Sequence, residues 1–304
     1  MAMKVQIFVR YLAVLAFALF AAGAQARAET TGDWKASVDT KEPGKINLSL
    51  EQRRDGGGRN QMGHTFDFAE LQGLSREQAA AGGPVRFSLV REAGTIDCEG
   101  SFQNGKGSGT FRFTANQGFA SAMKGRGFDF EKASSKHSDG DDLERRLFAA
   151  AMLNVTTALA DDLLSAGFGP LDVDDLFKAA IFKVDSKVMR EMKASGFPNL
   201  GMEELVKARI FKIDADFVTQ VTRMGFDKEP FESLVKMRIF KVTPEFIDEA
   251  RREGLTNLNV EGLVKMRIFK IDADFIRRAK AEGIPLEVEE LVQERIGVRR
   301  RTRN

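Results

Sequence analysis

The segment LVKMRIFKVTPEFIDEARREG, from Leu234 to Gly254, recurs in closely similar form 29 residues later, from Leu263 to Gly283. A leucine begins five such copies in the C-terminal half, and a last partial copy begins one residue early: Leu147, Leu176, Leu205, Leu234, Leu263 and Leu291. A glycine lies twenty residues after each full start: Gly167, Gly196, Gly225, Gly254 and Gly283. Self-similarity at a fixed period is typical of architectures in which short helical units stack on one another. The sequence therefore predicts a solenoid of αα-hairpin repeats over residues 143–297.

Each copy carries the signals of two helices, here called helix A and helix B. In the copy from Val260, apolar residues cover a wide arc of helix A and predict its burial between neighbours: Val260, Leu263, Val264, Met266, Ile268 and Phe269. Helix B is preceded by residues whose side-chain oxygens accept from free N–H groups of the first turn: Thr156, Asp185, Asp214, Thr243 and Asp272. The recurrent glycine suits the left-handed residue that ends a helix. These signals together predict five helix pairs.

The first and last copies depart from the pattern, as the ends of a stack should. The first has Ala149, Ala151 and Asn154 where later copies carry basic residues, so we expect it to pack on the preceding domain. The last has Gln293 in place of a lysine and is expected to form a polar cap. Residues 298–304 form a basic tail.

Residues 27–130 show the period-two alternation of half-buried β-strands. Its apolar positions are Ile46, Leu48 and Leu50; Phe66 and Phe68; Val85, Phe87 and Leu89; and Phe111 and Phe113. Asn104-Gly105 predicts a hairpin tip, and Ser75 with Gln78 predicts a capping box for a short helix. We expect a small antiparallel sheet or sandwich of five to seven strands. Polar residues 131–142 are interpreted as a linker, so the fold class is α+β.

Residues 1–26 have the organisation of a signal peptide. Lys4 and Arg10 precede an apolar run to Ala22, and Ala24-Gln25-Ala26 is a small-residue cleavage site. The protein is therefore predicted to be periplasmic or secreted, with an uncleaved leader as the alternative that would keep it at the membrane. Cys98 is the one cysteine, which excludes an internal disulfide and is interpreted as a small buried side chain.

Charge and residue usage weigh against nucleic-acid binding and against catalysis. Without Lys4 and Arg10, basic and acidic side chains are equal in number at 44 each, so no overall basic field attracts nucleic acid. His64 and His137 are the two histidines, and neither has a metal-ligand partner at a useful spacing. We predict no catalytic residues, no metal site and no cofactor.

Lysines and arginines of the repeats form the strongest candidate binding surface. Three repeat positions are basic: Lys178, Lys207, Lys236 and Lys265; Arg209, Arg238 and Arg267; and Lys183, Lys212, Lys241 and Lys270. Stacking is expected to align equivalent residues in rows, which suit an anionic polymer or an acidic protein face. The alternative is a solvated surface, neutralised by nearby carboxylates such as Asp214, Asp216, Glu245, Asp272 and Asp274.

The stretch Leu234–Ile247 resembles helical repeats of exported bacterial proteins that also carry a small β domain. It is also similar to repeats in C-terminal extensions of beta-lactam-sensor-type membrane metallopeptidases. The β segments Arg91–Thr95 and Glu99–Phe102 resemble segments that accompany such repeats. The resemblance implies an extracytoplasmic interaction or sensing module. It assigns no reaction, because the His-Glu-x-x-His zinc-protease motif is absent from the sequence.

The sequence is best interpreted as a non-enzymatic extracytoplasmic scaffold that engages a protein or an anionic cell-envelope polymer through its helical repeats. One alternative is a hydrolase with its site on the β domain, near two carboxylates or near His64. Another is a sensory or regulatory ectodomain held at the membrane by an uncleaved leader.

Overall fold

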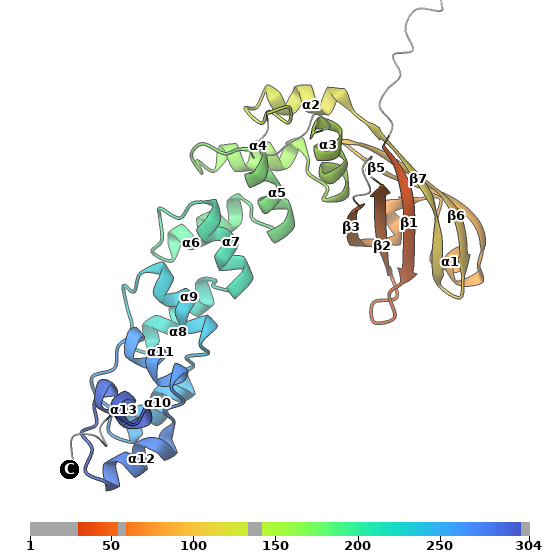
Figure 1. The fold of residues 1–304 in the computed structure, drawn as a ribbon. Helices are drawn as coiled ribbons and strands as arrows, with labels where there is room; N and C mark the ends of the chain where they lie inside the picture. The colour runs from red at the N-terminus through yellow and green to blue at the C-terminus, as the bar shows by residue number, and fades with distance from the viewer. Residues whose placement is uncertain (1–29, 54–58, 133–141, 299–304) are drawn as a thin grey trace, which may run out of the picture. The chain divides into compact units, whose positions relative to one another are not determined.

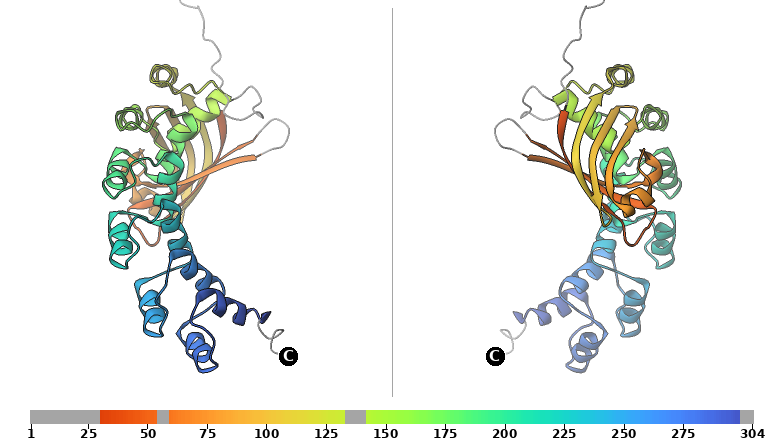
Figure 2. Two further views of the ribbon diagram at one scale, coloured as in Figure 1. Left: turned by 90° about the vertical axis from the view of Figure 1, so that its left-hand side faces the viewer. Right: turned by 90° about the vertical axis from the view of Figure 1, so that its right-hand side faces the viewer.

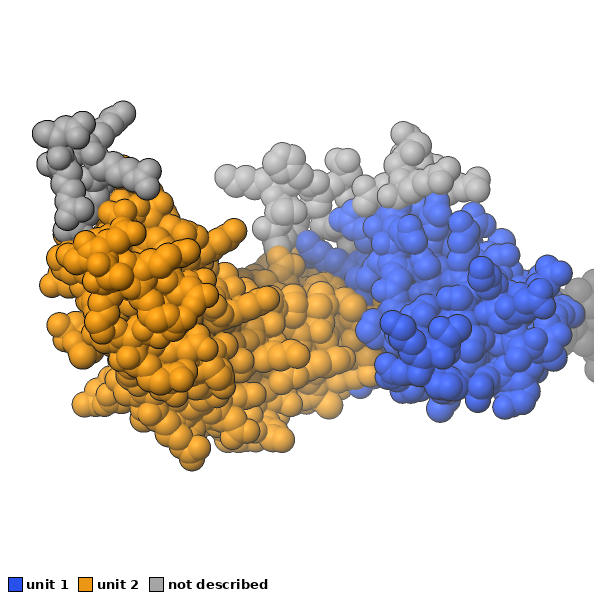
Figure 3. All heavy atoms as spheres, turned by 90° about the horizontal axis from the view of Figure 1, so that it is seen from below, with its two compact units in different colours: residues 1–116, 139–149 blue, residues 117–138, 150–304 orange. Residues whose placement is uncertain are grey.

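The computed structural model describes residues 30–53, 59–132 and 142–298. The predicted signal peptide, residues 133–141 of the predicted linker and residues 299–304 of the basic tail lie outside the described residues. Contacts divide the chain into two compact units, coloured separately in Figure 3. Unit 1 comprises residues 1–116 and 139–149, and unit 2 comprises residues 117–138 and 150–304.

Unit 1 contains one curled antiparallel sheet of seven strands, in the order β3-β2-β1-β7-β6-β5-β4 (Figure 1). The strands are β1 Thr30–Val38, β2 Lys45–Arg53, β3 Arg59–Asp67, β4 Leu71–Gln72, β5 Gly83–Arg91, β6 Gly94–Gln103 and β7 Lys106–Ala115. A run of helices follows the sheet in the chain. The predicted α+β class is therefore confirmed, and the β region is a single sheet.

The alternating residues of the sheet divide into an apolar face and a polar face. Ile46, Leu89 and Phe113 lie on the apolar face and are fully buried. Asn104 and Gly105 form the predicted hairpin tip between β6 and β7, both with positive φ. Phe68 was expected in a strand, but it begins a 3₁₀ turn (Phe68–Glu70) after β3 ends.

Helices cover the apolar face within unit 1. The capping box of Ser75 and Gln78 begins α1 (Arg76–Ala81), as predicted, and α1 contacts β1, β5 and β6. In α3 (Asp142–Met152), the ring of Phe148 stacks on Phe111 with centroids 5.6 Å apart. The expectation that the first repeat packs on the β region is thus confirmed for the start of α3.

The boundaries of the two units differ from those that the sequence suggests at residues 130 and 142. The segment with α2 (Gln117–Lys124) groups with the repeats, because α2 contacts α4 and the ring of Phe130 meets that of Phe177. The start of α3 groups with the sheet. The apolar contacts of these segments therefore decide which unit each one joins, and their order in the chain does not.

Helix pairs succeed one another along the second half of the chain (Figures 1 and 2). After α3, the helices are α4 Thr157–Ser165, α5 Val173–Phe182, α6 Ser186–Ala194, α7 Met202–Phe211, α8 Ala215–Arg223, α9 Phe231–Ile239, α10 Pro244–Arg252, α11 Val260–Ile268, α12 Ala273–Ala281 and α13 Val288–Arg295. The A helices α5, α7, α9, α11 and α13 contact one another in that order. In the described part of the chain, no single helix is long and apolar enough to span a membrane, although α3 and α4 pass that test as a pair bent by 86°.

The predicted caps of helix B are present in every full repeat. Each of the five N-cap side chains accepts a hydrogen bond from the backbone three residues on: Thr156, Asp185, Asp214, Thr243 and Asp272. Each of the five recurrent glycines has a positive φ, as the left-handed residue after a helix requires. The leucines that begin the copies are all buried: Leu147, Leu176, Leu205, Leu234, Leu263 and Leu291.

A partly buried polar contact joins α4 and α6 inside unit 2. The carboxylate of Asp162 accepts hydrogen bonds from Ser186 Oγ at 2.6 Å and from Ser186 N at 2.7 Å. Arg190 also donates to Ser186 Oγ. The hydrogen bonds from Ser186 lower the pKa of Asp162.

Replacing Asp162 by alanine should lower the free energy of unfolding by about 2 kcal/mol, because two donors of Ser186 lose a charged acceptor. The lowered pKa means that the carboxylate stabilises the fold above the ordinary Asp pKa, and that this contribution disappears as the pH falls through the folded-state pKa. Urea denaturation followed by circular dichroism, at neutral and acidic pH, measures both effects. Asp161→Ala on the same helix is the control, since its pair with Arg126 is exposed and should contribute below about 1 kcal/mol. Equal losses in the two variants would contradict the prediction.

Candidate binding surface of the helical repeats

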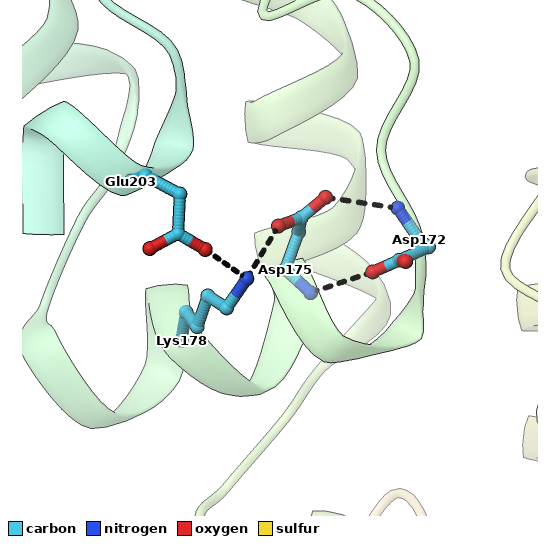
Figure 4. Close-up of polar contacts among 4 residues, drawn as sticks. All are labelled: Asp172, Asp175, Lys178 and Glu203. Atoms are coloured by element: carbon cyan, nitrogen blue, oxygen red, sulfur yellow. Dashed lines mark hydrogen bonds and ion pairs between the residues drawn. The ribbon is translucent and has the colours of Figure 1, made fainter. Parts of the chain in front are cut away.

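The first basic row pairs with acidic residues of the next repeat. Lys178 Nζ lies 2.5 Å from Glu203 Oε1, on the following helix A, and 3.3 Å from Asp175 Oδ1 (Figure 4). Asp175 also exchanges hydrogen bonds with Asp172 across the N-terminus of α5. The hydrogen bond from Lys178 to Glu203 raises the pKa of the lysine.

The same ion pair recurs at every later junction between A helices. The pairs are Lys207–Glu232, Lys236–Glu261 and Lys265–Glu289. The neutralising carboxylates are thus glutamates of the next helix A. Of the aspartates considered from sequence, Asp214 and Asp272 cap helix B, and Asp274 pairs with Arg277. The first row therefore connects repeats, with exposed pairs that contribute about 0.2–1 kcal/mol each.

The second basic row caps the C-terminus of the preceding helix A. Arg209 Nε donates to the carbonyl of Phe182 at 3.1 Å, and Arg238 Nη2 donates to that of Lys212 at 2.7 Å. Arg267 Nε donates to the carbonyl of Lys241 at 3.0 Å. A cation near the last carbonyls of a helix satisfies free acceptors and opposes the helix dipole.

Aromatic rings of helix B complete these arginine contacts. The guanidinium of Arg238 lies 3.7 Å from the ring centroid of Phe217, and that of Arg267 lies 4.4 Å from that of Phe246. Arg295 in the partial copy repeats the arrangement, with a bond to the carbonyl of Phe269 and a place 5.0 Å from Phe275. Arg295 is missing from the row predicted above, although it lies four residues after Leu291, just as Arg238 lies four residues after Leu234. The second row, like the first, serves stacking.

The third basic row remains exposed and adopts an unusual backbone conformation. Lys183, Lys212, Lys241 and Lys270 each follow a helix A with φ between 53° and 57°. Within residues 142–298, no ion pair involves these four lysines. The left-handed conformation costs a residue with a Cβ roughly 1 kcal/mol, a cost that glycine avoids. Helix B ends with glycine at the equivalent place in each repeat.

A row of isoleucines accompanies these lysines, two residues before each of them. Ile181, Ile210, Ile239 and Ile268 are 49%, 50%, 49% and 50% exposed. Ile296 continues the row after α13. We call the four isoleucines and the four lysines of the third row the Ile–Lys edge. Because the A helices contact one another in order, the edge runs along the repeats.

The expectation that Ile268 is buried with the rest of its helix is wrong. At about 100° per residue, Ile268 is rotated about 140° from Leu263, which is fully buried on the core side of α11. The equivalent residue of the first copy, Met152, is buried. The wide apolar arc of helix A therefore includes residues of two kinds, those that are buried in the core and those that form an exposed row.

The polar face of the sheet in unit 1 has an open hollow of about 860 Å³, whose lining includes Asp33, Asp97 and Glu99. Glu99 pairs with Arg86 at 2.7 Å, and Asp97 accepts a hydrogen bond from Ser88 at 2.5 Å. Such cross-strand pairs are ordinary on the solvent face of a sheet. A hydrolytic site here stays a prediction without an observation that favours it.

Two other residues were candidates for a catalytic or metal-binding role. Cys98 lines this hollow, and His64 does not. His64 is in β3 and lines a separate hollow whose lining contains no carboxylate among the described residues. Cys98 is buried as expected, and burial raises the pKa of its thiol to about 12. His137 lies outside the described residues. Over the described ranges, no group of three or more His, Cys, Asp or Glu is placed to hold a metal ion.

No protein-family model and no curated protein matches this chain. The resemblance to repeat extensions of sensor-type metallopeptidases therefore stays a prediction. The function must be argued from the surface that the repeats present.

Proposed function

We propose that the protein is a non-enzymatic scaffold that binds a protein partner along the Ile–Lys edge. The observation that carries the proposal is the recurrence of a half-exposed isoleucine at the same place in four successive repeats. Single exposed apolar residues are common on protein surfaces, but an ordered row of them marks an interaction site.

The isoleucine row supplies a defined part of the energy that specific binding requires. Covering the exposed half of one isoleucine contributes about 1 kcal/mol, so four or five give about 4–5 kcal/mol before the cost of association. That sum equals only the low end of the association cost of about 4–15 kcal/mol, so the lysines of the edge must contribute as well. Binding is therefore a property of the array, as expected for stacked repeats that present extended surfaces.

The rows of the candidate surface contribute unequally to this proposal. Lys207, Lys236, Lys265, Arg209, Arg238 and Arg267 already contact neighbouring repeats. Lys212, Lys241 and Lys270 remain available for an acidic partner. An anionic envelope polymer would use these lysines alone, whereas a protein would also cover the isoleucines, which favours the protein. The proposed setting is the periplasm or the cell exterior, on the basis of the leader sequence.

The test is capture of proteins from an envelope extract of the organism that encodes the chain. Captured proteins are identified by mass spectrometry and bound again in purified form. Changing Ile210, Ile239 and Ile268 together to serine should weaken that binding at least about tenfold. Leu164→Ser, at an exposed leucine of α4 away from the edge, is the control and should leave binding unchanged. Equal binding by the triple serine variant would refute the proposed surface.

A further inference from the structure

We infer that the Ile–Lys edge binds an extended, acidic peptide segment whose apolar side chains recur at every third residue. This inference rests on the proposed function and specifies the occupant. It follows from the spacing of the edge, from its charge and from the conformation of its lysines.

The spacing of the isoleucines is set by the packing of neighbouring A helices. The A helices contact one another in order. Helices in direct contact lie about 8–10 Å apart, so we expect about that distance between successive isoleucines. A polyproline II segment rises about 3.1 Å per residue and returns to the same face after three residues, or about 9.3 Å. Two residues of a β-strand cover about 6.8 Å, and two turns of an α-helix about 10.8 Å. Only the three-residue period keeps register over four contacts.

The charge of the edge selects an acidic segment. Lys183, Lys212, Lys241 and Lys270 are exposed, and the described residues offer them no ion pair. The two other basic rows are used in contacts between repeats. A partner with one carboxylate for each repeat would therefore meet one available ammonium group for each isoleucine.

The backbone conformation of these lysines indicates that their side chains have a use. Each holds a positive φ that glycine would adopt without strain, and glycine does occupy the matching position after helix B. Stacking alone does not require lysine at this position, because the end of helix A requires only a residue with a left-handed backbone. The lysine side chain adds a charge two residues after the isoleucine, at a cost in conformational energy.

Two occupants from the chain itself are disfavoured by charge. The C-terminal tail carries Arg299, Arg300, Arg301 and Arg303, which would lie against the lysines of the edge. A second copy docked edge to edge would place lysine against lysine. A separate acidic segment avoids both repulsions.

The inference is tested with the full mature chain and synthetic labelled peptides, by fluorescence anisotropy at low and high salt. The first peptide repeats the unit Ile-Glu-Pro four times. The comparison peptides are a scramble of the same composition and an amphipathic helix with one isoleucine per seven residues. We expect the period-three peptide to bind at least about tenfold more tightly than either, with affinity falling as salt rises.

Variants of the edge separate its two components. Changing Lys212, Lys241 and Lys270 to glutamate should abolish binding, whereas the same change at Lys187, Lys193 and Lys280, which are exposed on B helices, should have little effect. Ile239→Ser with Ile268→Ser should weaken binding about tenfold or more. Lys241→Gly should keep the fold at equal or higher stability and still weaken binding, a combination that a structural role for the lysine would not produce.

Several outcomes would overturn the inference. Equal binding of the scrambled peptide, or tighter binding of the helical peptide, would reject the period-three segment. Binding of inorganic polyphosphate that is unaffected by the isoleucine changes would point to an anionic polymer. If these peptides fail while the serine variant still loses its captured partner, the scaffold function stands and only the occupant is wrong.

Discussion

Replacing Leu234 by alanine is expected to lower the free energy of unfolding by about 3 kcal/mol. The side chain lies on the core side of α9 and is only 1% exposed. Its removal therefore leaves a cavity between neighbouring helix pairs. In a stack, each unit is stabilised mainly by its neighbours, so the loss should reduce the cooperativity of the whole array. Chemical denaturation followed by far-ultraviolet circular dichroism measures both the midpoint and the slope.

Ile239→Ala on the same helix is the matched control for that experiment. Ile239 is half exposed, so its truncation removes few internal contacts and should change stability by less than about 1 kcal/mol. Leu234→Ala should impair the fold, whereas Ile239→Ala should leave the fold intact and impair binding of a partner. A loss of stability in Ile239→Ala as large as that in Leu234→Ala would show that the edge is part of the core.

Replacing Gly109 by alanine is expected to prevent unit 1 from folding, or to destabilise it by more than about 4 kcal/mol. Gly109 lies opposite Gly100 of β6 and opposite Trp34 of β1. A Cβ at Gly109 would overlap the carbonyl oxygen of Glu99 and would lie 2.7 Å from Trp34 Nε1. The indole is fully buried and donates a hydrogen bond to that carbonyl, so it has no room to move.

Gly63→Ala is the matched control in the same sheet. A Cβ there would have its nearest neighbours at 3.8 Å, which is ordinary van der Waals contact. Tryptophan fluorescence reports the state of the sheet directly, because Trp34 is the one tryptophan of the chain. A native emission spectrum and an unchanged denaturation midpoint for Gly109→Ala would refute the claim that Gly100 and Gly109 create the space for the indole.

The three basic rows show how similar residues in one repeat acquire different roles. The lysine at the centre of helix A connects to the next repeat, and the arginine two residues on caps the previous one. The lysine after the helix is left to solvent beside an isoleucine. The sequence therefore predicted too large a basic surface, because two of the three rows are used in stacking. It also missed the exposed isoleucines, because they lie among the buried apolar residues of helix A.

The helix pairs and strands of this protein could be predicted from its sequence alone. The 29-residue period, the N-cap residues and the glycine stops predicted the helix pairs, because caps and turns depend on local backbone chemistry that a short segment contains in full. The alternation in residues 27–130 predicted strands for the same reason. Gly107 and Gly109 lie inside β7, where a Cβ would meet the ring of Phe102 or of Trp34, and no local turn signal explains glycine at these two positions.

Tertiary structure alone decided which faces of those units are occupied. Whether Lys236 is free depends on Glu261, 25 residues away, and whether Ile268 is buried depends on which side of α11 packs against the core. These are distances between units, and a period in the sequence contains no information on the rotation of one unit against the next. The Ile–Lys edge can be defined only after stacking has buried the core side of helix A and has paired its other lysines with the next repeat.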